Sequence, residues 1–234
     1  MATMSPARES LVAAGVRLLE RDGLAALSVR NVAAEAGTST MAVYTHFGGM
    51  TKLVDAIAVD VFVRFTAVLT DVPQTDDPVA DFLAMGLAYH QFALANPQRY
   101  QLMFGTATPT SIAQFRSDLT VTGSATNRAE WAESFGALRD GVRRMMAAGR
   151  IRPGDELAVA GRLWSVNHGA VMLELAGFFG HEGHGLSHIL GPLIIDTLVG
   201  MGDDRDAATQ SLTSVVAAAT DGPGQRSSRS SRAT

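Results

Sequence analysis

A stretch of eight residues, STMAVYTH at positions 39–46, carries four hydroxyl groups, an imidazole and a thioether. Hydroxyl and imidazole groups are suited to hydrogen bonds with phosphate oxygens, and an apolar side chain can contact the methyl group of thymine. Val43 and Phe47 are four residues apart, so a helix here would turn both of them inward. The same helix would present Met41, Tyr44 and Thr45 to the outside, which indicates a surface that contacts nucleic acid.

A second group of chemically active residues lies further along the chain and comprises His181, Glu182, His184 and His188. Two histidines four residues apart on a helix can hold zinc from one side. Two glycines lie within the same stretch, however, and favour a flexible connector between helices. We therefore predict no metal site and no cofactor, and a metal sensor built on this cluster is kept as an alternative.

Residues for catalysis are present but are not arranged for it. Glu174, His168 and the His181–His188 cluster are the candidates for an all-α enzyme, and no acid, base and nucleophile have a spacing that would bring them together. Cysteine is absent, which excludes a thiolate nucleophile. We predict that the chain is not an enzyme and has no catalytic residues.

The composition sets limits on the class of protein. Of the 234 residues, 47% are apolar, which is enough for a substantial core. The lack of cysteine excludes disulfides, and charged residues or His interrupt every apolar run, so we expect a cytoplasmic protein without membrane spans. The net charge is −4, but five basic and five acidic residues balance within the first 55 positions. The charge therefore neither supports nor excludes a DNA partner.

Helical spacing of apolar residues dominates the sequence and no alternating strand pattern occurs, so we predict an all-α fold of about nine helices. Residues 1–50 are expected to form a tri-helical helix-turn-helix DNA-binding domain. Residues 51–202 are expected to form a helical ligand-binding and dimerisation domain. Residues 203–234 end in GPGQRSSRSSRAT and are expected to be a disordered tail.

The three N-terminal helices have recognisable boundaries. Ser5 starts the first and Gly23 ends it, Ser28 caps the second, Gly37 makes the turn and Ser39 caps the third. In a helix-turn-helix the start of the second motif helix reads base edges, while polar groups around it hold phosphates. The candidates for base and phosphate contacts are Arg30, Ser39, Thr40, Met41, Tyr44, Thr45 and His46. A half-buried structural role is the alternative for the tyrosine.

Two C-terminal stretches are apolar on two faces, one from Glu156 to about Phe179 and one from Leu186 to Met201. A helix with two apolar faces is covered on both, so these stretches are the candidates for a four-helix interface between two copies. Pro192 should kink the second stretch or mark its true start. The expected dimer-interface residues are Leu163, Val166, Ala170, Leu173, Leu186, Ile189, Leu193 and Leu198.

Aromatic and methionine side chains between residues 89 and 172 can either line a ligand cavity or fill an ordinary core. Trp164 and His168 share one helical face, and methionine suits a cavity that tolerates different ligand shapes. The candidate ligand contacts, with core packing as the alternative, are Tyr89, Phe92, Met103, Phe104, Phe135, Met145, Trp164, His168 and Met172.

The segment LSVRNVAAEAGTSTMAVYTHFGGMTKLV resembles the DNA-binding segment of the TetR family of bacterial transcription regulators. The resemblance implies an all-helical homodimer with an N-terminal helix-turn-helix and a variable C-terminal domain that binds a small ligand and the partner subunit. Gly37, Ser39, Tyr44, His46 and Phe47 lie on the family pattern. The family commonly has a lysine at the N-terminus of the fourth helix, where this chain has Met50, so we expect Lys52 to make the phosphate contact instead.

The C-terminal part is similar to a subset of the family named for a Trp, His, Gly signature. The stretches WSVNHGAVMLEL at 164–175 and YHQFALANPQRYQLMF at 89–104 carry this similarity. The chain is thus expected to be a ligand-responsive repressor that binds a palindromic operator in double-stranded DNA as a homodimer and is released by a small, largely apolar effector. A ligand-blind DNA-binding protein is the second alternative.

Overall fold

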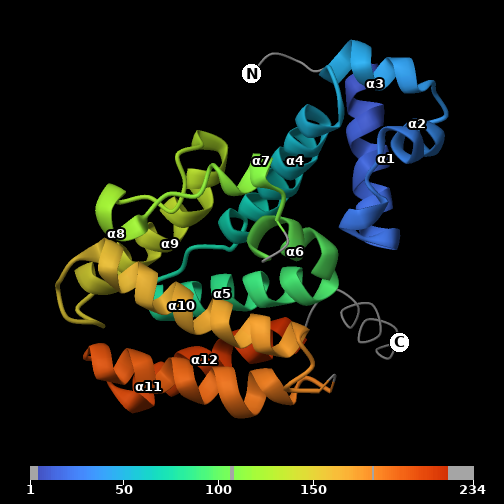
Figure 1. The fold of residues 1–234 in the computed structure, drawn as a ribbon. Coiled ribbons are helices and arrows are strands. Elements are labelled where there is room, and N and C mark those ends of the chain that lie inside the picture. Colours follow the sequence, from blue (N-terminus) through green and yellow to red (C-terminus); the bar gives the residue numbers. More distant parts are fainter. Residues whose placement is uncertain (1–4, 106–107, 181, 221–234) are drawn as a thin grey trace, which may run out of the picture. The chain divides into compact units, whose positions relative to one another are not determined.

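The computed structural model describes residues 5–105, 108–180 and 182–220, and these residues fold as helices joined by loops (Figure 1). The expected all-α fold class is confirmed, although the described residues form twelve α-helices instead of about nine. In chain order they are α1 (Pro6–Asp22), α2 (Val29–Glu35), α3 (Thr40–Phe47), α4 (Met50–Thr70), α5 (Pro78–Ala95), α6 (Pro97–Phe104), α7 (Thr110–Ala113), α8 (Leu119–Thr122), α9 (Ala129–Ala147), α10 (Glu156–Leu175), α11 (Gly191–Met201) and α12 (Arg205–Thr220). A 3₁₀ turn (Leu24–Ala26) precedes α2, and a π-helical segment (Gly185–Leu190) precedes α11.

The chain forms two compact units, one of residues 1–68 and 91–135 and the other of residues 69–90 and 136–234. The units do not coincide with the expected domains, because residues 91–135 pack with the N-terminal helices instead of with the rest of the C-terminal part. Within the described residues, no helix is both long enough and apolar enough to cross a membrane.

Capping and close packing define the three N-terminal helices. Ser28 accepts a hydrogen bond from the backbone N–H of Asn31, as expected for an N-cap. Gly37 has a φ of 65°, and the backbone N–H groups of Gly37 and Thr38 donate to the carbonyls of Ala34 and Ala33. This pair of bonds is a Schellman motif, which needs a left-handed residue that glycine adopts without strain. The turn between α2 and α3 therefore depends on Gly37.

Helix α4 begins at Met50, as expected, and lies against α1. A Cβ atom at Gly15 of α1 would overlap the Ile57 side chain of α4, so the glycine permits this close approach. Aromatic side chains continue the core of the same unit: Phe62 of α4 stacks on Trp131 of α9 at 4.3 Å, and Phe65 of α4 lies 5.2 Å from the ring of Phe92. Paired aromatic rings of this kind stabilise a core beyond their burial alone.

In the second unit, α10 packs against both the π-helical segment and α11, and α11 packs against α12. Pro192 lies in the first turn of α11, which confirms that it marks the true start of this helix. Because proline has no N–H, it cannot donate to the carbonyl four residues before it, and a different hydrogen-bond pattern precedes it. The π-helical turn of residues 185–190 occupies this position.

The expected disordered tail is wrong for residues 205–220, because they form α12. Arg150 donates to both carboxylate oxygens of Asp203 at 2.7 and 3.0 Å and to Asp77 at 2.9 Å. Ser211 of α12 is 1% exposed and donates to the second oxygen of Asp77 at 2.6 Å. Burial and these tertiary hydrogen bonds supply the stability that composition alone does not reveal. The remainder of the expected tail, residues 221–234, lies outside the described residues.

Candidate nucleic-acid interface

Helix α3 is fixed on its inner side and open on its outer side. Val43 is fully buried and Phe47 is 3% exposed, whereas Met41 and Tyr44 are 66% and 54% exposed. The outward direction expected from the sequence is therefore the one observed for these two side chains, and Thr45 is exposed as well. A surface helix that exposes a methionine and a tyrosine side by side presents apolar and hydrogen-bonding groups together.

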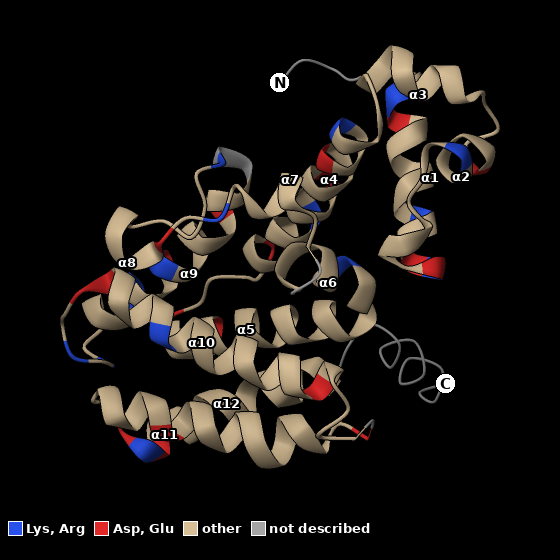
Figure 2. Ribbon diagram, in the orientation of Figure 1, with Lys and Arg blue, Asp and Glu red and all other residues tan. Residues whose placement is uncertain are grey.

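All eight predicted DNA contacts lie in the first compact unit. Seven of them are exposed, and His46 is partly buried. Helix α3 contains no Lys, Arg, Asp or Glu, so its surface is uncharged at its centre (Figure 2). Positive charge stands on the flanking elements instead, on Arg30 of α2 and on Lys52 in the first turn of α4.

Ser39 occupies the N-cap position of α3, as expected, but its side chain makes no capping hydrogen bond. The backbone closes the first turn instead, with the N–H of Ala42 donating to the Ser39 carbonyl at 3.0 Å. The Ser39 side chain thus leaves the N-terminus of α3 without a side-chain cap, and the peptide dipoles at a helix N-terminus favour an anion such as phosphate.

Arg8 of α1, which was not among the predicted residues, holds the other end of α3. Its guanidinium donates to the backbone carbonyl of His46 at 2.6 Å and lies 4.4 Å from the centre of the Phe47 ring. The charge thus meets the carbonyl end of the helix, where the dipole favours a cation, and it also makes a cation–π contact. No motif signals this role, because the two residues are 38 positions apart.

Two ion pairs join α1 to the end of α2. Glu35 accepts hydrogen bonds from Arg17 at 2.9 Å and from Arg21 at 3.1 Å. These hydrogen bonds hold the pKa of the Glu35 carboxyl below its usual range. Because α2 and α3 share one tight turn, the position of α2 on α1 also fixes the orientation of α3.

The predicted ligand contacts form separate groups. Tyr89, Trp164 and His168 meet in the second unit: the Trp164 Nε1–H donates to the Tyr89 hydroxyl at 3.4 Å, and this hydroxyl lies 2.9 Å from Nδ1 of His168. In the same unit Met145 is fully buried and Met172 is partly exposed. The methionine at 145 therefore packs in the core.

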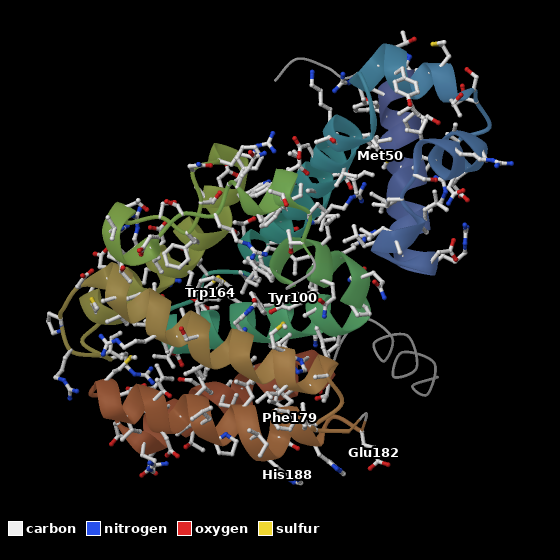
Figure 3. The ribbon with its side chains drawn as sticks, viewed as in Figure 1. Met50, Tyr100, Trp164, Phe179, Glu182 and His188 are labelled. Carbon is white, nitrogen blue, oxygen red and sulfur yellow. The ribbon has the colours of Figure 1, made fainter. Side chains whose placement is uncertain are left out.

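Four other candidates for ligand contact belong to the first unit, namely Phe92, Met103, Phe104 and Phe135. Phe104 lies at 5.0 Å from the ring of Tyr100, which is fully buried on α6 (Figure 3). Met103 is 2% exposed and Phe92 is 7% exposed, so both are core residues of the unit. On the other side of α6, Arg99 forms an ion pair with Glu20 of α1.

The predicted dimer-interface residues divide by exposure. Leu163, Ala170 and Leu198 are 1%, 7% and 0% exposed, so they pack inside the chain and present no surface to a partner. These three positions therefore differ from the expectation. Periodicity shows that each helix has two apolar faces, but it does not show which face packs within the chain and which one remains for a partner. Val166 and Leu186 are partly exposed. Three large side chains remain on the surface, at 43–46% exposure: Leu173, Ile189 and Leu193.

The described members of the histidine-rich cluster, Glu182, His184 and His188, do not form a group of three metal ligands. The rings of His184 and His188 stack at 5.2 Å, and Glu182 lies 3.8 Å from His184. Glu182 and His188 both point away from the protein (Figure 3). No group of three potential metal ligands occurs among the described residues, and His181 lies outside them.

A buried pair that no sequence pattern predicts joins α5 to α10. His90 Nε2 and Glu174 Oε2 are 2.7 Å apart, and both side chains are about 5% exposed. The alternative of an enzyme required Glu174 as an acid or base, but the residue is sealed against His90 in the core. The two side chains satisfy a hydrogen bond inside the protein, which is the usual structural condition for buried polar groups.

Comparison with known proteins agrees with this arrangement. Residues 11–57 match the family of bacterial regulatory proteins called tetR, and residues 82–189 match the tetracyclin repressor-like C-terminal domain. The comparison with curated proteins found no match. Both descriptions name regulators of the same family.

Solved structures share the fold at low sequence identity. A protein of unknown function from Rhodococcus sp. RHA1 is 24% identical, with a TM-score of 0.59 over 92% of this chain and 95% of that one. RolR without ligand is 14% identical, with a TM-score of 0.60 over 88% of this chain and 96% of its own. A tetR-family regulatory protein from Rhodococcus RHA1 is 19% identical, with a TM-score of 0.57 over 86% and 100% of the two chains. By its two matched domains, this chain is a transcriptional regulator of the TetR family with its DNA-binding domain at the N-terminus.

Proposed function

We propose that this protein is a ligand-responsive repressor that binds a palindromic operator as a homodimer and leaves it when a small, largely apolar ligand binds. The exposed outer face of α3, which carries Met41 and Tyr44 on a helix whose inner face is buried, is the observation that carries the proposal. A pair of exposed side chains, one a thioether and the other a phenol, is thus open to a partner on this helix. It suits the edge of a thymine and the adjoining phosphate.

The contacts are divided by chemistry. Thr40 and Met41 in the first turn of α3 read base edges, while Ser39, Tyr44 and His46 hold phosphates beside them. Arg30 on α2 and Lys52 on α4 supply the positive charge on either side. Lys52 is exposed in the first turn of α4, so its ammonium group is available to a phosphate.

A homodimer follows from the size of the reading surface. One eight-residue helix covers too few base pairs for a specific site, and two copies spaced by about 34–36 Å meet successive major grooves. The exposed Leu173, Ile189 and Leu193 on α10, the π-helical segment and α11 support a partner surface in the second unit. These three elements pack against one another, and large exposed apolar side chains are typical of an interface.

Ligand binding is proposed at the hydrogen-bonded group of Tyr89, Trp164 and His168. Indole N–H is only a donor, so the Tyr89 oxygen accepts from Trp164 and its own proton can go to Nδ1 of His168. That arrangement makes Nδ1 of His168 the acceptor of the Tyr89 proton and joins the three side chains in one polar group among apolar residues. RolR has been solved in complex with resorcinol, and its fold resembles this one. We also propose that the chain belongs to the subset of the family that is named for a Trp, His, Gly signature.

Release of the operator follows when the ligand binds the two conformational states of the dimer with different affinities. A ligand that favours one spacing of the two DNA-binding heads lowers operator affinity by the difference in its affinity for the two states. A ligand-blind DNA-binding protein remains the alternative, and it would keep the same operator affinity with every small molecule.

The experiment is selection of bound sequences from random duplex DNA with the full-length protein. The expected result is a palindrome whose half-sites are separated by one helical turn of about 10 base pairs or a multiple of it. A chain with Met41→Ala and Tyr44→Ala together is the matched control, because both residues are exposed and their loss leaves the core intact. Recovery of no common sequence, or the same sequences with the control, would contradict specific readout. A reporter gene behind the recovered operator then distinguishes repression from activation.

A further inference from the structure

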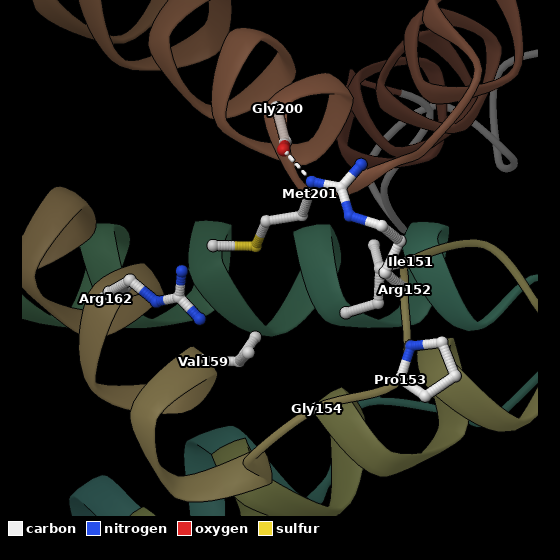
Figure 4. Close-up of a pocket in the computed structure, with 8 residues that line it drawn as sticks. All are labelled: Ile151, Arg152, Pro153, Gly154, Val159, Arg162, Gly200 and Met201. Atoms are coloured by element: carbon white, nitrogen blue, oxygen red, sulfur yellow. Dashed lines mark hydrogen bonds between the residues drawn. The ribbon is translucent and has the colours of Figure 1, made fainter.

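A pocket of about 140 Å³ lies in the second unit. It is formed by the loop before α10, the first two turns of α10 and the last turn of α11 (Figure 4). The lining residues are Ile151, Arg152, Pro153, Gly154, Val159, Arg162, Gly200 and Met201. None of the nine predicted ligand contacts is among them.

The lining contains two guanidinium groups and no carboxylate. Arg152 donates from one nitrogen to the backbone carbonyl of Gly200, and Arg162 donates from Nε to the carbonyl of Ala158 on its own helix. Each guanidinium has five N–H donors, so most of these donors remain for another partner. Figure 4 shows Arg162 reaching from α10 toward Met201 on the opposite wall.

The acidic residues closest in sequence are all engaged elsewhere. Asp155 accepts from the N–H groups of Leu157 and Ala158 as the N-cap of α10, and Glu156 accepts three hydrogen bonds from Arg143 at 3.0–3.1 Å. Near α11, Asp203 is held by Arg150. The positive charge of the pocket is therefore not neutralised by the described part of the chain, although the whole chain carries a net charge of −4.

Four of the lining side chains are apolar. Ile151, Pro153, Val159 and Met201 provide hydrocarbon and thioether surface beside the arginines. A cavity of about 150 Å³ holds one benzene molecule, so a pocket of this size accommodates a ligand built on a single small ring or a short chain. A guanidinium pairs with a carboxylate through two parallel hydrogen bonds, which a neutral group of the same shape cannot match.

We infer that this pocket binds a small organic carboxylate, with its carboxylate on Arg162 and Arg152 and its apolar body against Val159 and Met201. It is a second site, separate from the effector group on Tyr89, Trp164 and His168. Since the ligand would bridge the start of α10 and the end of α11, its binding stabilises the packing of these two helices by mass action.

Calorimetric titration of the full-length protein with benzoate tests the charge and the shape together. Benzamide is the neutral probe of the same shape, and inorganic phosphate is the anion without an apolar body. We expect benzoate to bind about tenfold or more tightly than benzamide and phosphate, because the bidentate charged hydrogen bonds and the apolar contacts are both needed. Equal binding of benzamide, or binding of phosphate as tight as that of benzoate, would overturn the inference.

Variants at Arg162 locate the site. Arg162→Gln should weaken benzoate binding about tenfold, and Arg162→Lys should weaken it less because the charge is kept. Arg139→Gln is the matched control, since Arg139 is an exposed arginine on the preceding helix that does not line the pocket. Benzoate affinity that is the same in Arg162→Gln and in the native protein rules the site out.

A local signal makes the test independent of any effect on folding. In protein labelled with ¹³C at the methionine methyl groups, benzoate should shift the Met201 resonance, which Met201→Leu assigns. If sedimentation shows that Arg162→Gln dissociates the dimer while benzoate leaves the Met201 signal of the native dimer unchanged, a carboxylate of the partner subunit fills the pocket instead. That result would overturn the proposed small-molecule site.

Discussion

The outer face of α3 and the exposed apolar side chains of α10 and α11 differ in chemistry, and each suits a different kind of contact. Helix α3 exposes a methionine and a tyrosine among hydroxyl groups, and its surroundings carry positive charge on separate elements. The surface with Leu173, Ile189 and Leu193 exposes three large apolar side chains at 43–46%. A mixed surface remains soluble and can release its partner, whereas an apolar surface is favoured only when it is covered.

The two regions are also held in place by different means. Helix α3 has eight residues and rests on two buried side chains, one glycine turn and the Arg8 contact at its end. Helices α10 and α11 pack along their lengths, with Leu163 and Leu198 buried between elements. The small reading helix therefore depends on a few specific contacts, while the larger interface depends on the extent of apolar burial. Substitutions should separate these two kinds of dependence.

The largest effect is expected from Ile189→Asp. In a two-fold interface each dimer would bury two new carboxylates without partners, which should cost about 3 kcal/mol or more and weaken the dimer about 100-fold. Sedimentation equilibrium measures this directly. Val121→Glu is the control, because Val121 is 79% exposed on α8 and lies outside the proposed surface. An unchanged dimer in Ile189→Asp would show that copies of the chain meet through another face.

The next effect concerns the reading surface. Tyr44→Ala should weaken operator binding by about 1 kcal/mol or more, roughly fivefold, through loss of a phosphate contact. Its melting temperature should stay close to that of the native protein, because Tyr44 is 54% exposed. Tyr44→Phe separates the hydroxyl from the ring. Operator affinity equal to native in Tyr44→Ala would remove this residue from the contacts and leave it as a support for α3.

The contrast between local contacts at α3 and extended packing at α10 and α11 also determines how much of the structure could be predicted from the sequence. Ser28, Gly37, Val43 and Phe47 were predictable, because caps, left-handed glycines and four-residue spacing act over a few positions. At α10 and α11 the periodicity identified apolar faces but could not assign Leu163 and the other buried positions to the core, because that choice depends on which helix covers which face.

Long-range polar contacts escaped prediction for a related reason. The Arg8 contact with α3 and the His90–Glu174 pair join residues 38 and 84 positions apart. Helix α12 was missed because its stability depends on Arg150, Asp77 and Ser211, which meet only in the folded chain. Caps, glycines and apolar spacing predict where the helices lie in the sequence. The tertiary contacts determine which faces of those helices are buried and which are exposed.

A smaller effect is expected from Lys52→Ala, and it concerns the salt dependence of binding more than its strength. If Lys52 replaces the lysine that the family has where this chain has Met50, its loss should lower the slope of log affinity against log salt by about 0.9. Arg64→Gln on the same helix is the control, because Arg64 is paired with Asp60 at 2.7 Å. The two variants are compared by operator titration at several salt concentrations. Identical slopes would assign the phosphate contact to another residue.

The smallest effect is expected where α2 is held on α1. The hydrogen bonds from Arg17 and Arg21 lower the pKa of Glu35 in the folded protein, so they favour folding while the carboxyl is ionised. This stabilisation is complete above the unfolded pKa of about 4.3 and is lost as pH falls through the lower folded value.

Thermal unfolding from pH 7 to pH 3 measures this contribution. The melting temperature of the native protein should exceed that of Glu35→Gln at pH 7, and the two should converge below about pH 4, with high salt reducing the difference at neutral pH. Glu133→Gln, at an exposed position on α9, is the control and should follow the native curve. A constant difference between native and Glu35→Gln across this range would mean that the side chain acts by packing. The orientation of α3 would then rest on Gly37 and Arg8, without a contribution from the ion pairs on α1.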